Sequence, residues 1–273
     1  MTKHSVFHAV GLMSGTSLDG LDIAYCRFER TIEGWHWKLL AADCAPWPVD
    51  AMLELGKLQD ATALEFARAD KRYGRAYGNL LRSFLERTKI SRVDLVASHG
   101  HTIFHQPGSG LTTQLGSGAV LSAACGYPVV SDFRTQDVAH GGQGAPLVPI
   151  GDRHLFGQYE ACLNLGGISN ISYEHEGKRI AFDVGPANIV LNPIAKQLGR
   201  SYDEDGARAR SGKLLPELLA ALNALPYYQQ AAPKSLGREW METNINPLLP
   251  ANANPHDLLH TCLLYTSPSP RDA

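Results

Sequence analysis

The stretch GLMSGTSLDGLD, residues 11–22, follows the apolar run SVFHAV and decides the fold of the first half of the chain. Residues 5–13 and 21–29, on either side of its polar centre, are rich in β-branched and aromatic residues, which predicts two strands joined by a hairpin turn. Glycines in such a turn permit close backbone approach, and its Ser and Thr donors can bind phosphate oxygens. Asp19 and Asp22 can hold Mg²⁺ through water or bind a sugar hydroxyl. An ordinary Gly/Asp hairpin turn is the alternative of equal weight.

The composition is that of a folded globular protein. The chain has 273 residues, 44% of them hydrophobic and 19% charged, which allows one large domain or two ordinary ones. The formal net charge of -2 lacks the basic footprint of nucleic-acid binding, and no apolar run is as long as a membrane span. We therefore expect a cytoplasmic protein with neither nucleic acid nor membrane as partner. The five cysteines form no CxxC pair and predict reduced thiols.

The pattern of apolar residues predicts an α/β fold in the first half. Strands and helices alternate, and a Gly/Pro-rich crossover at 139–149 separates the two halves. The expected elements after the hairpin are a strand at 35–48, helices within 50–89, a strand at 93–105, a helix of small residues at 116–126 and a strand at 127–133.

The second half repeats this beginning. LNLGGISN, residues 163–170, again places a glycine turn, Gly166 and Gly167, between two strands, which suggests a duplicated architecture with a cleft. In FDVGPAN, Asp183 ends a third strand beside Gly185, a position typical of a general base in α/β enzymes. Capping of the next helix by Asp183 is the alternative, with twice the weight from the residues alone.

Polar loops in the first half offer further candidates. SHGHTIFH contains His99 and His101, which can chelate a metal if they share one face of a strand, although no ligand-like partner follows. Hydrogen bonding of His99 to substrate and packing of a satisfied histidine are equal alternatives. Arg134 can bind a carboxylate or phosphate, or pair with Asp137 to hold its own loop. Lys234, in PKSLGRE, is expected to be structural.

The motifs occur together in a known order. GLMSGTSLDGLD, SHGHT, SDFRTQD, GGQGAPLVP, LNLGGISN, FDVGPAN and PKSLGRE resemble those of the anhydro-N-acetylmuramic acid kinases, from about Val10 to Arg238. The resemblance implies an α/β fold of duplicated actin-like ATPase (ribonuclease H-like) domains flanking a cleft. It implies residues 1–140 and 141–260 as the two domains, the second incomplete.

The resemblance also implies a reaction and a set of site residues. ATP would phosphorylate O6 of 1,6-anhydro-N-acetylmuramic acid while water opens the anhydro bridge, in peptidoglycan recycling, with Mg²⁺ as cofactor. Asp183 resembles the catalytic base, and His99 and Arg134 are weaker candidates for substrate contacts; no metal ligand is assigned. The expected ATP-binding residues are Gly15, Thr16, Ser17, Leu18, Asp19, Gly20, Leu21, Asp22, Gly166 and Gly167.

The sequence departs from the family at two places. His101 stands where glutamine is expected, and the chain does not continue into the family's Gly-rich adenosine-binding segment. We therefore expect the chain as written to be inactive. Residues 261–273 resemble a translated sequencing adapter and are expected to be a non-native tail, with a natural disordered tail as the alternative. A homodimer is one assembly that the resemblance leaves open.

Three other functions compete with this one. A kinase of the same superfamily that acts on an ordinary hexose would not need a base to activate water. A non-catalytic actin-like module would bind ATP without turnover. A zinc hydrolase built on the histidines would be inhibited by chelators without nucleotide.

Overall fold

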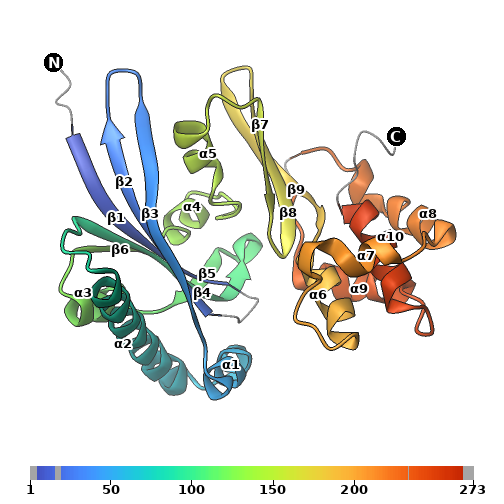
Figure 1. Ribbon diagram of the computed structural model, residues 1–273, viewed down its shortest axis with the longest axis horizontal. Coiled ribbons are helices and arrows are strands. Elements are labelled where there is room, and N and C mark those ends of the chain that lie inside the picture. The colour runs from blue at the N-terminus through green and yellow to red at the C-terminus, as the bar shows by residue number, and fades with distance from the viewer. Residues whose placement is uncertain (1–4, 16–19, 233, 267–273) are drawn as a thin grey trace. The chain divides into compact units, whose positions relative to one another are not determined.

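The computed structural model describes residues 5–15, 20–232 and 234–266, which divide into two compact units, Met1–Leu147 and Val148–Ala273 (Figure 1). The boundary lies within the Gly/Pro-rich segment that was expected to separate the halves. The expected domain limits at 140 and 260 stay a prediction. Among the described helices none is long and apolar enough to cross a membrane.

Unit 1 is built on a mixed sheet in the order β3-β2-β1-β4-β5, with β6 paired to β4. β1 and β2 form the predicted hairpin, β2 pairs with β3 antiparallel, and β4 runs parallel to both β1 and β6. The strands are β1 Ser5–Ser14, β2 Gly20–Arg30, β3 Trp35–Pro46, β4 Leu95–Gln106, β5 Leu111–Leu115 and β6 Val129–Ser131. The short β5 was not predicted, since TTQ gives it little apolar alternation.

In unit 1, the helices α2 (Ala63–Thr88) and α3 (Gly118–Cys125) pack against each other and against the sheet (Figure 1). The long α2 begins with a capping box, in which Thr62 and Glu65 exchange side-chain and backbone hydrogen bonds. A Cβ at Gly78 of α2 would lie 2.5 Å from the Cβ of Ala124 in α3, so glycine permits the close approach expected from the small residues of α3. The helices of the unit are α1 Val49–Leu55, α2 Ala63–Thr88, α3 Gly118–Cys125 and α4 Thr135–Ala139.

Unit 2 contains, after the short helix α5 (Pro149–Leu155), a second antiparallel meander in the order β7-β8-β9. In unit 1 the third strand of the meander, β3, is followed by helices, and in unit 2 the third strand, β9, is followed by α6. Each unit therefore contains the predicted succession of strand, glycine turn, strand, strand and helix. The strands are β7 Ala161–Leu165, β8 Ile168–His175 and β9 Lys178–Pro186. The fold class is α/β, as the sequence predicted.

Helices from α6 onward form the apolar core of unit 2 (Figure 1). The last of them, α10, buries Cys262 and Tyr265 in that core, although both residues belong to the segment expected to be a non-native tail. The nature of that segment stays a prediction. The helices are α5 Pro149–Leu155, α6 Asn188–Gln197, α7 Ala207–Ser211, α8 Pro216–Asn223, α9 Arg238–Asn244 and α10 Pro255–Thr266.

Candidate active site

The ends of the β1–β2 turn are held firmly by the sheet. Gly20 pairs with Pro46 of β3, and a Cβ at Gly20 would lie 2.5 Å from the carbonyl oxygen of Ala45. Glycine is therefore needed at position 20 for close approach of two strands. Leu21 is buried and Asp22 is exposed, as alternation along β2 requires. The expected ATP contacts Thr16, Ser17, Leu18 and Asp19 lie outside the described residues.

A buried hydrogen-bond network joins the end of β1 to β4. Ser14, which is 1% exposed, has its Oγ 2.9 Å from Nδ1 of His101, and Trp47 Nε1 donates to the same oxygen at 3.3 Å. His101 is 3% exposed, and burial lowers its pKa to about 4. The imidazole is therefore neutral at pH 7, and its hydrogen bond fixes the position of Ser14, directly before Gly15.

His99 faces a different environment from His101, because Gly100 interrupts the strand. Gly100 has a φ of 76°, and the β1–β4 register shifts there, so the two-residue spacing does not follow a regular strand. Arg134 Nε donates to His99 Nε2 at 2.8 Å, which leaves Nδ1–H to donate to the Gly100 carbonyl oxygen at 2.9 Å. Burial and the nearby Arg134 guanidinium lower the pKa of His99, so this imidazole is also neutral.

Arg134 and Asp137 hold the loop after β6, but through separate hydrogen bonds. The Arg134 guanidinium donates to the carbonyl oxygen of Gly144, and the Gly144 N–H donates to Asp137 Oδ2 at 2.6 Å. The loop is therefore pinned without an Arg134–Asp137 ion pair. A contact of His99 or Arg134 with substrate stays a prediction.

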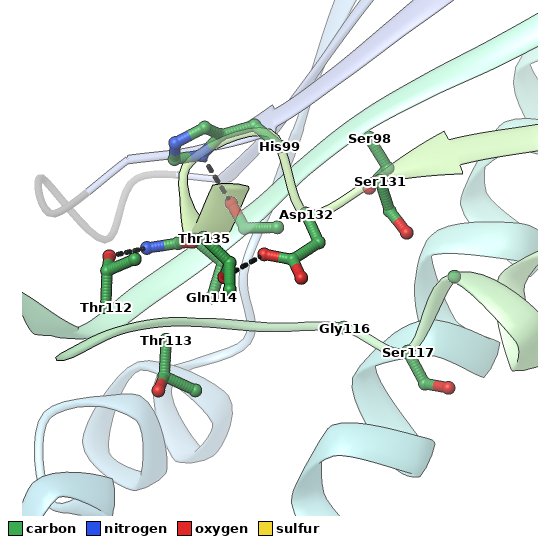
Figure 2. A pocket seen from close by; sticks show the side chains of 12 residues that line it. Ser98, His99, Thr112, Thr113, Gln114, Gly116, Ser117, Ser131, Asp132 and Thr135 are labelled. Carbon is green, nitrogen blue, oxygen red and sulfur yellow. Dashed lines mark hydrogen bonds between the residues drawn. The ribbon is translucent and has the colours of Figure 1, made fainter. Parts of the chain in front are cut away.

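A cavity of about 310 Å³ lies within unit 1, beside His99 (Figure 2). We call it the hydroxyl-lined cavity. Its lining residues come from β4, β5, β6, the turn after β6 and the starts of α3 and α4. Its hydroxyl groups belong to Ser98, Thr112, Thr113, Ser117, Ser131 and Thr135. The remaining described lining residues are His99, Gln114, Asp132 and the glycines Gly100, Gly116 and Gly118.

Asp183 lies in β9 at a β-bulge. Ser169 pairs with Gly185 and Asn170 pairs with Asp183, so one additional residue, Val184, is inserted into β9. Such bulges redirect the side chains beside them. The Asp183 side chain accepts the Leu236 N–H at Oδ2 over 2.8 Å, and burial raises its pKa. A carboxyl group with a raised pKa is suited to accept a proton near neutral pH.

The backbone of Asp183 is fixed on both sides. Its N–H donates to the carbonyl oxygen of Lys234 at 3.1 Å, and its own carbonyl oxygen accepts the Tyr227 hydroxyl at 2.7 Å. The Lys234 ammonium group donates to the Tyr227 carbonyl oxygen and lies 4.6 Å from the centre of the Tyr227 ring. Lys234 therefore has the structural role expected of it.

The helix-cap alternative for Asp183 finds no support in the described contacts. The residue that caps the N-terminus of α6 is Ala187, and it makes no side-chain capping bond. The first N–H groups of α6 are instead bonded to the glycine turn: Ala187 and Ile189 donate to the Gly167 carbonyl oxygen, and Asn188 donates to that of Gly166. The turn before β8 thus caps α6 through its carbonyl groups. The expected contact of Gly166 and Gly167 with ATP stays a prediction.

Metal ligation rests on few groups. Among the described residues, no three His, Cys, Asp or Glu side chains are placed to hold a metal ion. The exposed carboxylate of Asp22 is the described oxygen donor beside the β1–β2 turn. One or two carboxylates together with phosphate oxygens suffice for Mg²⁺, so the residues present fit a nucleotide-bound magnesium ion.

Comparison with known proteins identifies the class and then the family. The α/β fold with an antiparallel meander in each unit, together with the family match that follows, places the chain in the actin-like ATPase class. A family model described as anhydro-N-acetylmuramic acid kinase matches residues 7–273. The chain belongs to this family, and the predicted resemblance is confirmed.

Curated relatives carry the same description. The anhydro-N-acetylmuramic acid kinase of Pseudomonas putida is 42% identical over 86% of this chain and 68% of its own length. That of Pseudomonas paraeruginosa is 38% identical over 97% of this chain and 76% of its own length, and that of Chromobacterium violaceum is 36% identical over 97% and 75%. These relatives are phosphotransferases, and the chain spans about two thirds to three quarters of their length.

Sequence reasoning missed several groups that the structure brings to these places. Ser98, Gln114 and Asp132 meet in the hydroxyl-lined cavity, and Tyr227 holds the backbone of Asp183. Their positions in the sequence carry little signal, because each lies far along the chain from the residues it meets.

Proposed function

We propose that this protein converts 1,6-anhydro-N-acetylmuramic acid, ATP and water to N-acetylmuramic acid 6-phosphate and ADP. The expected inactivity of the chain as written stays a prediction, which the assay below also tests. The observation that carries the proposal is Asp183, a half-buried carboxyl group whose pKa burial raises, held at a β-bulge in a member of a kinase family. The reaction requires a base for water as well as phosphoryl transfer, and this carboxyl group is suited to that task.

The proposed reaction begins with the attack of water on the sugar. Asp183 takes a proton from water, and the water oxygen forms a bond to C1 of the sugar. The C1–O6 bond of the anhydro bridge breaks, and its electron pair stays on O6. O6 then bonds to the γ-phosphorus of ATP, and the bond from that phosphorus to the bridging oxygen breaks to release ADP. Because Oδ2 of Asp183 accepts the Leu236 N–H, we assign the proton to Oδ1.

The glycine turns are the proposed contacts for ATP. Gly15 and the segment 20–22 follow the buried Ser14, whose network with His101 fixes the start of the turn. Asp22 is the described residue that would hold Mg²⁺ through water, and the ion would neutralise the transferring phosphoryl group. That Gly166 and Gly167 contact ATP is also part of this proposal. We also propose that the protein acts in the cytoplasm in amino-sugar recycling; a homodimer stays a prediction.

The test uses ATP, Mg²⁺, the anhydro sugar and water enriched in the heavy oxygen isotope. We expect sugar-dependent ADP release and a 6-phosphate that carries the heavy oxygen at C1. Asp183→Asn should lower turnover by about 10²- to 10⁴-fold, the usual worth of a general base, with ATP affinity preserved. Asp203→Asn is the matched control in the same unit, since Asp203 accepts the Arg208 and Ala209 N–H groups at the start of α7.

Two outcomes would contradict the proposal in different ways. A phosphorylated hexose without heavy oxygen at C1 would assign the chain to ordinary sugar phosphorylation. ATP binding with no turnover on any sugar, in this chain and in a form extended to the length of its curated relatives, would assign the protein to a non-catalytic nucleotide-binding module.

A further inference from the structure

Two residues that line the hydroxyl-lined cavity each carry a buried polar atom that finds no partner among the described residues. The two atoms are Ser98 Oγ and Gln114 Oε1, and Ser98 is 1% exposed. Leaving a buried polar atom unpaired costs about 1–3 kcal/mol. Since both residues line the same cavity, a ligand that bonds to both atoms would remove this cost.

The other end of the Gln114 amide is hydrogen-bonded. Its Nε2 donates to Thr112 Oγ1 at 2.9 Å (Figure 2) and to Thr102 Oγ1 at 3.5 Å, and Oε1 has no partner among the described residues. Oε1 only accepts hydrogen bonds, whereas the Ser98 hydroxyl both donates and accepts. The pair therefore suits a ligand with an O–H or N–H donor beside an acceptor.

The charge of the cavity distinguishes between ligands. Asp132 contributes a carboxylate, which accepts a hydrogen bond from Thr135 Oγ1. Two cations border the lining. Lys71 donates to Ser117 Oγ at 3.2 Å and is paired with Asp70. Arg134 donates to His99 and to the Gly144 carbonyl oxygen. Because both cations are already paired and the carboxylate lines the cavity itself, a ligand group that donates a hydrogen bond to Asp132 suits the cavity better than a phosphate or carboxylate.

Asp132 also adopts a backbone conformation that few non-glycine residues take. Its φ is 62°, in the left-handed region, which Asp tolerates better than most other non-glycine residues. The turn after β6 in this way brings the Asp132 carboxylate to the lining of the cavity.

We propose that the hydroxyl-lined cavity binds uncharged hydroxyl or acetamido groups of the amino sugar, with Ser98, Gln114 and Asp132 as specificity-determining residues. This inference rests on the proposed function, and it assigns the triphosphate and the lactyl carboxylate to other places. A volume of about 310 Å³ is at the lower end of the range for small-molecule sites, which fits part or all of one monosaccharide.

The experiment measures binding of 1,6-anhydro-N-acetylmuramic acid to the 273-residue chain by calorimetry without nucleotide. Ser98→Ala should weaken sugar binding about tenfold, equal to one lost hydrogen bond of about 1.4 kcal/mol, and leave ATP affinity unchanged. Because the Ser98 hydroxyl has no described partner, Ser98→Ala should not lower the melting temperature. Gln114→Met should weaken sugar binding in the same way.

Ser122→Ala is the matched control. Ser122 lies in α3, outside the lining residues, and its hydroxyl donates to the Tyr127 carbonyl oxygen at 2.7 Å. This variant should have a lower melting temperature than the wild type and the same affinity for the sugar. The reversed pattern between Ser98→Ala and Ser122→Ala separates a binding role from a structural one.

The lactyl-free analogue 1,6-anhydro-N-acetylglucosamine identifies the bound group. If the cavity takes uncharged groups, Ser98→Ala weakens binding of both sugars by the same factor. Loss of the Ser98→Ala effect with the lactyl-free analogue would show that the cavity binds the carboxylate, and would overturn the inference.

The remaining outcomes separate this inference from the proposed function. If the wild-type chain forms the 6-phosphate but Ser98→Ala and Gln114→Met bind the sugar as the wild type does, the inference fails and the function stands. If sugar binding depends on Ser98 but neither this chain nor a form extended to the length of its relatives makes the 6-phosphate, the function fails and the site stands. If the wild-type chain does not bind the sugar, both are contradicted.

Discussion

The hydroxyl of Ser14 and the imidazole of His101 form a buried hydrogen bond of 2.9 Å that joins the end of β1 to β4. The bond lies directly before the glycine turn of the β1–β2 hairpin. Trp47 donates to the same Ser14 oxygen, so three elements of unit 1 meet at this point. The position of the first residue of the turn is therefore decided by tertiary contacts as well as by the hairpin.

Protonation of His101 should control the acid stability of unit 1. Its folded pKa is about 4 against an ordinary value of 6.5, so between these values the unfolded chain binds more protons than the folded one. The contribution of His101 to the free energy of unfolding is fully present above pH 6.5. It decreases as the pH drops toward 4, by about 3 kcal/mol in all. The pKa of His99 is also lowered, and it adds a loss in the same direction.

Denaturant unfolding at pH 7 and pH 4.5 measures this loss. His101→Gln should make the free energy of unfolding less dependent on pH, because glutamine has no proton to gain. His175→Gln, at an exposed position of β8, is the control and should keep the wild-type dependence. A His101→Gln protein with the full wild-type dependence would refute this account.

Asp183 should set the acid limb of the pH–rate profile. Burial raises its pKa above the ordinary 3.8, so kcat should fall as the pH drops through that raised value, because the base must be ionised to accept a proton. Steady-state rates from pH 4 to pH 8 would locate the limb. A limb centred at or below 3.8 would exclude Asp183 as the base.

The same carboxyl group should cost stability at neutral pH. A raised folded pKa means that the folded chain binds more protons than the unfolded one between pH 3.8 and the raised value, so stability falls as the pH rises through that window. Asp183→Asn keeps an acceptor for the Leu236 N–H and removes the charge. Its melting temperature at pH 7 should match or exceed that of the wild type, and the difference should vanish below pH 3.8. A large loss of melting temperature would contradict this.

Tyr227→Phe should disturb the position of Asp183 without removing it. The substitution deletes the 2.7 Å hydrogen bond from the Tyr227 hydroxyl to the Asp183 carbonyl oxygen, at a cost of about 1 kcal/mol in unfolding free energy. We expect kcat to fall while the KM for ATP stays near its wild-type value. Tyr228→Phe is the control, because the Tyr228 hydroxyl contacts Tyr265. Equal effects of the two substitutions on kcat would remove the positioning role.

Alanine at two glycines should separate packing from binding. A Cβ at Gly20 would lie 2.5 Å from a backbone oxygen, so Gly20→Ala should destabilise unit 1 by about 1–3 kcal/mol. A Cβ at Gly167 would meet only Ile189 at 3.9 Å, so Gly167→Ala should fold normally. If the Gly167 turn binds phosphate, this variant should bind ATP about tenfold more weakly, a loss of about 1.4 kcal/mol. Wild-type ATP affinity would leave the turn with its helix-capping role alone.

The α/β class, the β1–β2 hairpin, the repeated meander and the family could all be predicted from the sequence. These features rest on local patterns: alternation along strands, glycine at turns and the order of short motifs. The helix of small residues ending at Gly126 was also predictable, because Gly126 has the left-handed conformation, with a φ of 80°, that closes many helices.

The contacts between polar side chains that are distant in the sequence could not be predicted and are known from the folded structure. Ser98, Gln114 and Asp132 come from separate strands and a turn, and no spacing along the chain shows that they line one cavity. The bulge at Val184 likewise depends on how β9 pairs with β8, and it directs the Asp183 side chain toward Leu236 and away from capping α6. Side-chain neighbours across a sheet are set by register and burial, and these are properties of the folded chain.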